Sequence, residues 1–158
     1  MEQYIEPFIK VCETVFCDLC NTEVKAKRVY FTSKDEYESS WDISGIIGLS
    51  GEIFGAVAIS LKDITAYRIA KILTGNEHSH FHRDVTDSIG EIVNIVAGNV
   101  KKEFEESFRT KISLPSIITG KAHAIIWPNE KTRIICIPFS IFDKQEMCLS
   151  IAIDPSRV

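Results

Sequence analysis

Asp87, Glu91 and Asn94 follow one another at spacings of four and three, and Gly98 follows one turn later. Residues three or four apart on an α-helix are neighbours, so Glu91 and Asn94 would lie side by side. A carboxamide has one acceptor and two donors, and it can orient a water molecule without adding negative charge. A carboxylate beside it is a fixed anion that can pair with a basic group on a partner. The pattern therefore indicates a site that positions reacting groups.

These residues belong to a long helix predicted over 84–108. An α-helix turns ~100° per residue, so its apolar residues form one wide stripe that predicts the core face. The stripe consists of Val85, Ile89, Ile92, Val93, Val96, Ala97, Val100 and Phe104. Measured from Val85, the residues Asp87, Glu91, Asn94 and Gly98 lie between ~180° and ~240° and so face outward.

Part of this polar face also has a purely structural interpretation. Asp84 is predicted as the N-cap, which places Asp87 in the first turn, where an acid suits the helix dipole. Gly90 and Gly98 each cost a helix interior up to ~1 kcal/mol relative to Ala, so their presence favours a packing or docking reason. Ile95, at the edge of the polar face, is a predicted apolar contact for a partner.

The rest of the chain predicts one domain over 1–158, of the α+β or mixed α/β class, with a mainly antiparallel sheet. Helical periodicity predicts two more helices, 4–20 and a segment from Ser60 through Leu73 whose Ser-Leu-Lys-Asp start resembles a capping box. Alternating or apolar runs predict strands at 27–32 and 43–49, a hairpin over 43–60, and two further hairpins, 116–119 with 122–127 and 133–139 with 146–153. Gly120-Lys121 is the predicted turn of the first of these two.

Composition limits the function classes. The 158 residues are 45% hydrophobic and 25% charged, with a net charge of −4 and a pI near 5.6. These values predict a folded globular protein, and they do not favour a nucleic-acid partner, which requires a basic face. The start of the chain is interrupted by charges, and no apolar run is long enough for a bilayer, so a cytoplasmic protein with no membrane segment is expected.

The five cysteines and the histidine loop are the other candidates for chemistry. Cys17 and Cys20 form a CxxC without a second pair at zinc spacing, so reduced thiols are predicted. His78, His80 and His82 alternate, and an extended chain would point them to one side as a metal set. No obvious fourth ligand accompanies them in a loop that should be solvated, so no metal is predicted. A metal-binding or small-molecule-binding protein rests on this loop alone.

The run DSIGEIVNIVAGN resembles the signature of the CheX/CheC family of chemotaxis phosphatases, an acid followed by Glu-x-x-Asn on a long surface helix. Tyr4, Pro7 and Phe8 are similar to the start of CheX proteins. The segments SGEIFGAVAIS and LPSIITGKAH follow in the family's order. Among all the glutamates, only Glu91 has an asparagine three residues later. The chain therefore resembles CheX proteins, which carry one such centre, rather than CheC proteins, which carry two.

The resemblance implies a CheC-like fold, with long helices packed on one face of the sheet, and dephosphorylation of a phosphorylated CheY-like receiver. Asn94 would orient the attacking water, and Glu91 would dock against the receiver's active-site lysine. Asp87, Ile95 and Gly98 would complete the docking surface. The receiver would supply Mg²⁺, so no cofactor of the chain's own is expected, and a homodimer is implied. The alternative is a non-catalytic receiver-binding module or a structural module of the flagellar switch.

Overall fold

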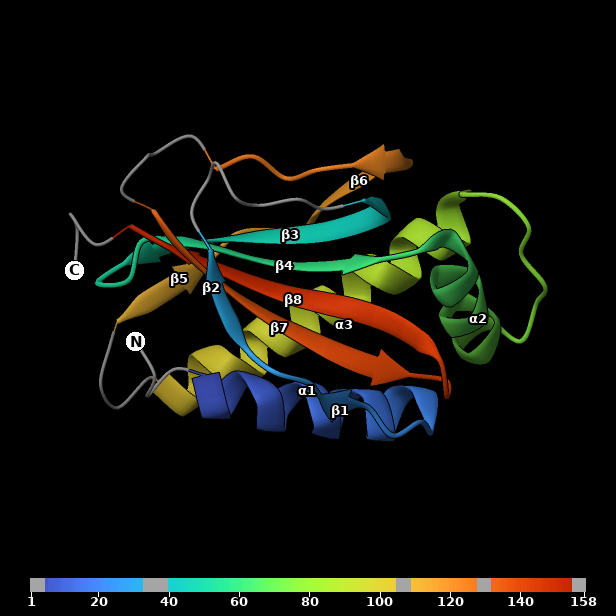
Figure 1. Cartoon of the computed structure of the whole chain (residues 1–158), viewed down its shortest axis with the longest axis horizontal. Helices are drawn as coiled ribbons and strands as arrows, with labels where there is room; N and C mark the ends of the chain where they lie inside the picture. Colours follow the sequence, from blue (N-terminus) through green and yellow to red (C-terminus); the bar gives the residue numbers. More distant parts are fainter. Residues whose placement is uncertain (1–4, 33–39, 105–108, 128–131, 155–158) are drawn as a thin grey trace.

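Helices cover one face of an antiparallel sheet in the computed structural model, which describes residues 5–32, 40–104, 109–127 and 132–154 (Figure 1). The helices are α1 (Ile5–Cys20), α2 (Asp63–Thr74) and α3 (Arg83–Phe104). The strands are β1 (Lys25–Ala26), β2 (Tyr30–Thr32), β3 (Trp41–Gly51), β4 (Gly55–Leu61), β5 (Thr110–Ile112), β6 (Ser116–His123), β7 (Arg133–Ile141) and β8 (Gln145–Ile153). Among these described segments, no helix is long and apolar enough to cross a bilayer.

The sheet is built from two hairpins that lie side by side. Its order is β1-β7-β8-β4-β3-β5, with β2 also paired to β7 and β6 also paired to β3, and every described pair is antiparallel. The hairpins β3–β4 and β7–β8 join through β4 and β8. These pairings confirm the predicted antiparallel α+β architecture and the predicted hairpins over 43–60 and 133–153.

The two faces of the sheet carry separate apolar clusters, because successive side chains of a strand point to opposite sides. On β7, Ile135 and Ile137 belong to the large core shared with the helices. Their neighbours Ile134 and Cys136 belong to a smaller cluster on the other face, which includes Trp127. α1 and α3 run along the first face, and α2 lies at one end of the sheet (Figure 1). The core therefore fixes the orientation of α3, with its apolar side against the sheet and its opposite side toward solvent.

The predicted hairpin 116–119 with 122–127 is wrong. β6 continues through Gly120-Lys121 to His123 and pairs with β3 rather than folding back on itself. The register shifts between Trp41 and Ile43, and Gly120 and Ala122 have φ values of 157° and 55°. A glycine inside a strand commonly marks a bulge, and that is its role here. Of the predicted strand 27–32, only Tyr30–Thr32 (β2) is a strand, and the short β1 precedes the predicted range; both pair with β7.

Asp42 of β3 joins three elements. Its Oδ2 accepts a hydrogen bond from the N–H of Asp63 at 3.1 Å, and its Oδ1 accepts one from the N–H of Ala122 at 3.3 Å. The first bond satisfies the N-terminus of α2, whose own N-cap, Lys62, makes no side-chain cap. Ser60, in the predicted capping box, is instead buried in β4 with its Oγ 2.7 Å from the Oγ of Ser44. The predicted local cap is replaced by a distant one.

Asp42 makes the stability of this junction depend on pH. Burial would raise the pKa of its carboxyl, but the two backbone N–H donors and the nearby Lys62 and Lys121 outweigh burial and lower the pKa. A lowered pKa contributes stability above the unfolded pKa of about 3.9, and this stability is lost as the pH falls through the folded value.

We expect Asp42→Asn to lower the free energy of unfolding at pH 7 by about 1–2 kcal/mol, because an amide has one acceptor for two N–H donors. The difference from wild type should shrink as the pH falls below the unfolded pKa of about 3.9 and through the lower pKa of the folded carboxyl. Urea unfolding at several pH values measures both effects. Asp18→Asn, at an exposed position of α1, is the matched control. An equal loss at pH 7 and pH 3 would contradict the charge argument.

Gly45 lets α3 lie close to β3 beside the polar face. A Cβ built at Gly45 would be 2.9 Å from Cγ1 of Val93, a fully buried side chain next to Asn94 in sequence. We expect Gly45→Ala to lower the free energy of unfolding by about 1–3 kcal/mol through overpacking. Gly98→Ala is the control, because nothing lies within 4 Å of its added Cβ, and it should raise stability by up to about 1 kcal/mol. Urea midpoints that move together for both variants would contradict this account.

Candidate functional site

The sheet and the helical core decide which side of α3 faces solvent. The stripe residues Val85, Ile89, Ile92, Val93, Val96, Ala97 and Val100 are at most 3% exposed. Glu91 and Asn94, on the other side, are exposed. The predicted division of the helix into a core face and a polar face is therefore confirmed over its described side chains. The predicted end, 105–108, lies outside the described residues.

α3 begins at Arg83, and its N-cap is His82 rather than the predicted Asp84. The carbonyl of His82 accepts the N–H groups of Val85 and Thr86, both at 3.1 Å. Its Nδ1 accepts the N–H of Asp84, also at 3.1 Å. A neutral imidazole nitrogen can act as a capping acceptor, although capping preferences favour Asp at such a boundary. The sequence prediction failed because it followed those preferences.

Asp87 is exposed and already has a partner. Nε of Arg83 lies 3.3 Å from Oδ2 of Asp87, one helical turn away, and both side chains are largely in solvent. An exposed pair of this kind contributes little to stability. Asp87 could therefore leave Arg83 and bind a partner with little loss of stability.

The two glycines of α3 differ in their surroundings. A Cβ at Gly90 would be 3.6 Å from Cδ1 of Ile117 and 3.9 Å from Cγ of Pro115, so this glycine lies under the segment that leads into β6. Gly98 has nothing within 4 Å of the same position. Packing within the chain therefore explains why a glycine occupies position 90. It does not explain the glycine at position 98. Ile95, predicted as a partner contact, is half-buried and packs against the helical core, so only part of it is accessible.

The connection before β6 adds a residue that the sequence analysis missed. Leu114 is 86% exposed and precedes Pro115, the residue that approaches Gly90. An apolar side chain so open beside a polar site is a candidate contact for a protein partner. Its exposure depends on the path between β5 and β6, so no sequence signal distinguishes it from a core leucine.

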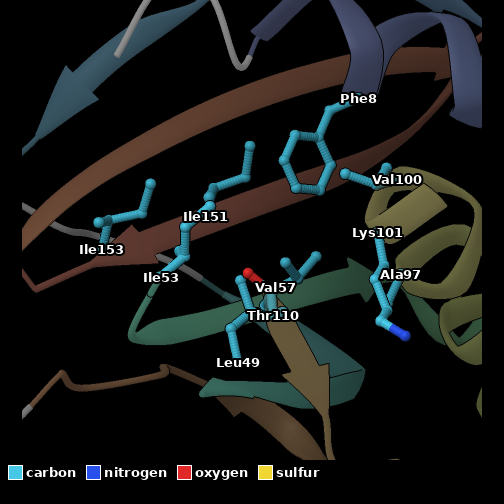
Figure 2. Close-up of a pocket in the computed structure, with 10 residues that line it drawn as sticks. All are labelled: Phe8, Leu49, Ile53, Val57, Ala97, Val100, Lys101, Thr110, Ile151 and Ile153. Atoms are coloured by element: carbon cyan, nitrogen blue, oxygen red, sulfur yellow. The ribbon is translucent and has the colours of Figure 1, made fainter. Parts of the chain in front are cut away.

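Three hollows among the described residues are lined by side chains other than Glu91 and Asn94. A cavity of about 20 Å³ lies between Phe8 of α1, Val100 of α3, Ile53 of the β3–β4 turn and Ile151 of β8 (Figure 2). It is lined mostly by apolar side chains and has room for about one water molecule, too little for a substrate. Two open grooves, one along α2 and one beside Trp41, are also lined by residues other than Glu91 and Asn94. These two side chains are therefore exposed on α3 outside the three hollows.

The pair formed by Ser44 and His123 lacks the exposure that catalysis requires. Oγ of Ser44 lies 2.8 Å from Nε2 of His123, whose Nδ1 donates to the carbonyl of Gly120 at 2.8 Å. The arrangement resembles a nucleophile with its base, but Ser44 is fully buried and no substrate can reach it.

Four of the five cysteines are buried. All five are free thiols, as predicted, and only Cys17 is exposed. Burial raises the pKa of Cys20 to about 11, so the second cysteine of the CxxC stays protonated and unreactive at neutral pH.

Comparison with known proteins gives a consistent result. A model of the family described as chemotaxis phosphatase CheX matches residues 43–140, more than half of the chain. No curated protein matches. The solved structure of the chemotaxis protein CheX from Vibrio vulnificus is 27% identical, with a TM-score of 0.86 over 96% of this chain and 99% of that one.

Two further solved structures extend the comparison. A CheC-like superfamily protein from Shewanella sp. PV-4 is 24% identical, with a TM-score of 0.85 over 96% and 97% of the two chains, and it supports the CheC-like fold alone. The CheX of a CheX–CheY–BeF₃–Mg²⁺ complex from Borrelia burgdorferi is 27% identical, with a TM-score of 0.80 over 95% and 97%.

Proposed function

The chain belongs to the CheX family of chemotaxis phosphatases, and from this premise we propose that it hydrolyses the aspartyl phosphate of a CheY-type receiver by means of Asn94 and Glu91. The observation that carries the proposal is the exposure of Glu91 and Asn94 on one face of α3, outside the three hollows described above. Such an exposed pair is accessible to a protein partner. It suits insertion into the active site of another protein.

The partner would supply what this face lacks. A receiver holds its own phosphoryl group and Mg²⁺, and the Borrelia burgdorferi CheX was solved with CheY and Mg²⁺. Hydrolysis then requires a positioned water more than a new catalytic base, because phosphoryl transfer depends on positioning and electrostatics.

In the proposed reaction, the carboxamide of Asn94 binds the attacking water and orients its oxygen toward phosphorus. The bond from water oxygen to phosphorus forms as the bond from phosphorus to the aspartate oxygen breaks. The aspartate leaves as a carboxylate, and inorganic phosphate carries away the protons of the water. Asn94 adds no negative charge beside the phosphoryl group. Glu91, one turn away, pairs with a receiver lysine and fixes the register of docking.

The docking surface would include Asp87 and Gly98 on α3, the accessible part of Ile95, and Leu114 at the edge. The acids suit a basic rim on the receiver, and Leu114 provides an apolar contact. The proposal also includes a single domain over 1–158 and a homodimer, as in the CheX proteins that the sequence resembles. Sedimentation equilibrium of the purified chain tests the dimer.

The direct test is phosphate release from a purified phospho-receiver of the same source, with this protein at one-hundredth of the receiver concentration. We expect release to accelerate in proportion to the added protein and to continue for many turnovers. Binding without acceleration, shown by titration of the same receiver, would reject the enzyme and favour the non-catalytic docking module. A receiver mixed with bovine serum albumin gives the uncatalysed rate.

Gly98 tests the extent of the docking surface. Because an added side chain at this position meets nothing in the chain itself, Gly98→Leu should fold with at least wild-type stability. It should raise the dissociation constant for the receiver about tenfold or more, because a bulky side chain would hold the two surfaces apart. Calorimetric titration measures the affinity. Unchanged affinity would remove Gly98 from the interface.

A further inference from the structure

The junction between α2 and α3 contains a continuous chain of hydrogen bonds through two histidines. Nε2 of His78 lies 3.0 Å from Oγ1 of Thr74, at the end of α2. Nδ1 of His78 lies 2.7 Å from Nε2 of His82, which caps α3. The rings of the two histidines are 4.6 Å apart between centroids. Two imidazoles are therefore held against each other by the ends of two helices.

The backbone at the start of α3 determines which nitrogens carry protons. The N–H of Asp84 can only donate, so Nδ1 of His82 is an acceptor and its Nε2 carries the proton. That proton is donated to Nδ1 of His78, whose Nε2 then donates to Thr74. Oγ1 of Thr74 donates in turn to the carbonyl of Ala70 at 2.8 Å. The fixed tautomer directs the lone pair of His78 Nδ1 toward His82.

A carboxylate completes this arrangement. One ligand atom from each of His78, His82 and Asp84 lies within 4.8 Å of the other two. The sequence alone indicates three alternating histidines without a further ligand, because Asp84 is predicted there as a helix cap. In the structure Asp84 lies in the first turn of α3 beside the capping His82, and the capping role falls to the histidine.

We propose that His78, His82 and Asp84 form a binding site for a divalent transition-metal ion, with Zn²⁺ the best fit, at the junction of α2 and α3. Two imidazoles and a carboxylate are a common protein ligand set for Zn²⁺, which takes four ligands at about 2.0–2.2 Å. The ring of His80 lies 5.1 Å from that of His82 between centroids, so His80 or a water molecule can take the fourth position. Ca²⁺ and Mg²⁺ favour oxygen ligands and fit this set poorly.

The ligands must rearrange to hold a shared ion, because their atoms now lie within 4.8 Å of one another and tetrahedral zinc requires about 3.3 Å. Two zinc-bound nitrogens at tetrahedral angles are about 3.3 Å apart, so the 2.7 Å contact between the histidines must open by roughly 0.6 Å. The loop that carries His78 and His80 is largely exposed and can move by this amount. An open groove of about 590 Å³ along α2 reaches His78 and gives a hydrated ion access. Thr74 remains in place to orient the ring of His78, as a supporting residue commonly does at metal sites.

Metal binding would compete with the cap of α3. A neutral imidazole has one lone pair, so coordination through Nε2 of His82 moves its proton to Nδ1. Nδ1 then no longer accepts the N–H of Asp84, and this amide turns to solvent. Metal binding would therefore remove a helix cap and link the end of α2 to the start of α3. This link would lie one turn before Asp87 of the polar face.

The test uses the full chain without a polyhistidine tag, titrated with Co²⁺ and then with Zn²⁺. We expect Co²⁺ to give visible absorption bands of a low-coordinate nitrogen and oxygen site, and Zn²⁺ to displace it at one equivalent. His78→Gln and His82→Gln should each weaken Zn²⁺ binding at least tenfold, and Thr74→Val should weaken it by a smaller factor. His123→Gln, at the histidine that is bonded to Ser44, is the matched control and should bind as wild type.

A backbone readout separates this site from adventitious binding. The amide resonance of Asp84 in a ¹⁵N-correlation spectrum should shift on addition of Zn²⁺ and stay unmoved with Mg²⁺. Three results would overturn the proposal: no saturable Zn²⁺ binding by wild type, equal binding by His82→Gln and His123→Gln, or an unmoved Asp84 amide at saturation. Far-UV circular dichroism of each variant confirms that the folds compared are the same.

Discussion

Asn94→Ala should reduce the turnover of a phospho-receiver by about 10²–10³-fold, which corresponds to about 2.7–4 kcal/mol of transition-state stabilisation. The side chain is exposed and contributes nothing to the core, so the variant should unfold at the wild-type urea concentration. Its affinity for the receiver should change little, because Glu91 and the rest of the docking surface remain. The loss should therefore appear in kcat, with KM nearly unchanged.

Two further variants sharpen this measurement. Asn94→Asp has almost the same shape but places a negative charge beside the phosphoryl group, and it should be as inactive as the alanine variant. Asn99→Ala removes an amide from the same helix at a position about 140° further round, and it should retain full activity. Full activity of Asn94→Ala, or activity in Asn94→Asp, would show that the amide does not position the water.

Glu91 should control affinity, because its carboxylate would pair with a lysine inside the receiver's site. Glu91→Gln removes the charge and keeps the shape, and we expect the dissociation constant to rise about tenfold. Glu91→Lys places two like charges opposite each other and should raise the dissociation constant by about 100-fold or more. Titration against a receiver loaded with beryllofluoride and Mg²⁺ measures both values without turnover.

The matched control is Glu103→Gln, the same chemical change at an exposed position near the end of α3. It should leave the dissociation constant within about twofold of wild type, because an exposed charge away from the contact contributes little. At saturating protein, Glu91→Gln should recover much of the wild-type kcat. A loss confined to kcat, with unchanged affinity, would instead assign Glu91 to the chemical step.

The local features of this protein follow from the sequence because their physical causes are local. The period of α3 separates Val93 from Glu91 and Asn94 around the helix, so the outward face could be predicted without a structure. The hairpins β3–β4 and β7–β8 join strands that are close in the chain, and their pairing was predicted correctly. The Glu-x-x-Asn pattern and its setting were sufficient to recognise the family.

Two of the misses share one cause, which is that the deciding partner is distant in sequence, and the third arises from an unusual local cap. β6 pairs with β3 because β3 provides a long free edge, and the Gly120 turn signal then becomes a bulge. The N-terminus of α2 is satisfied by Asp42 from another strand, so its own capping box is unused. The start of α3 shifts to Arg83 because the ring of His82, fixed by His78 from the preceding loop, reaches the N–H of Asp84.

The sequence by itself therefore determined which residues of α3 face outward, the class of the fold and the family, since periodicity and short-range pairing are properties of neighbouring residues. Only the tertiary structure decided which residues from other elements lie beside that outward face. It explained Gly90 by the packing of β6 and left Gly98 open, and it exposed Leu114 beside the polar face. It also brought Asp84 to the histidines. These outcomes depend on contacts between elements, and the positions of those contacts are set only when the whole sheet and its helices pack together.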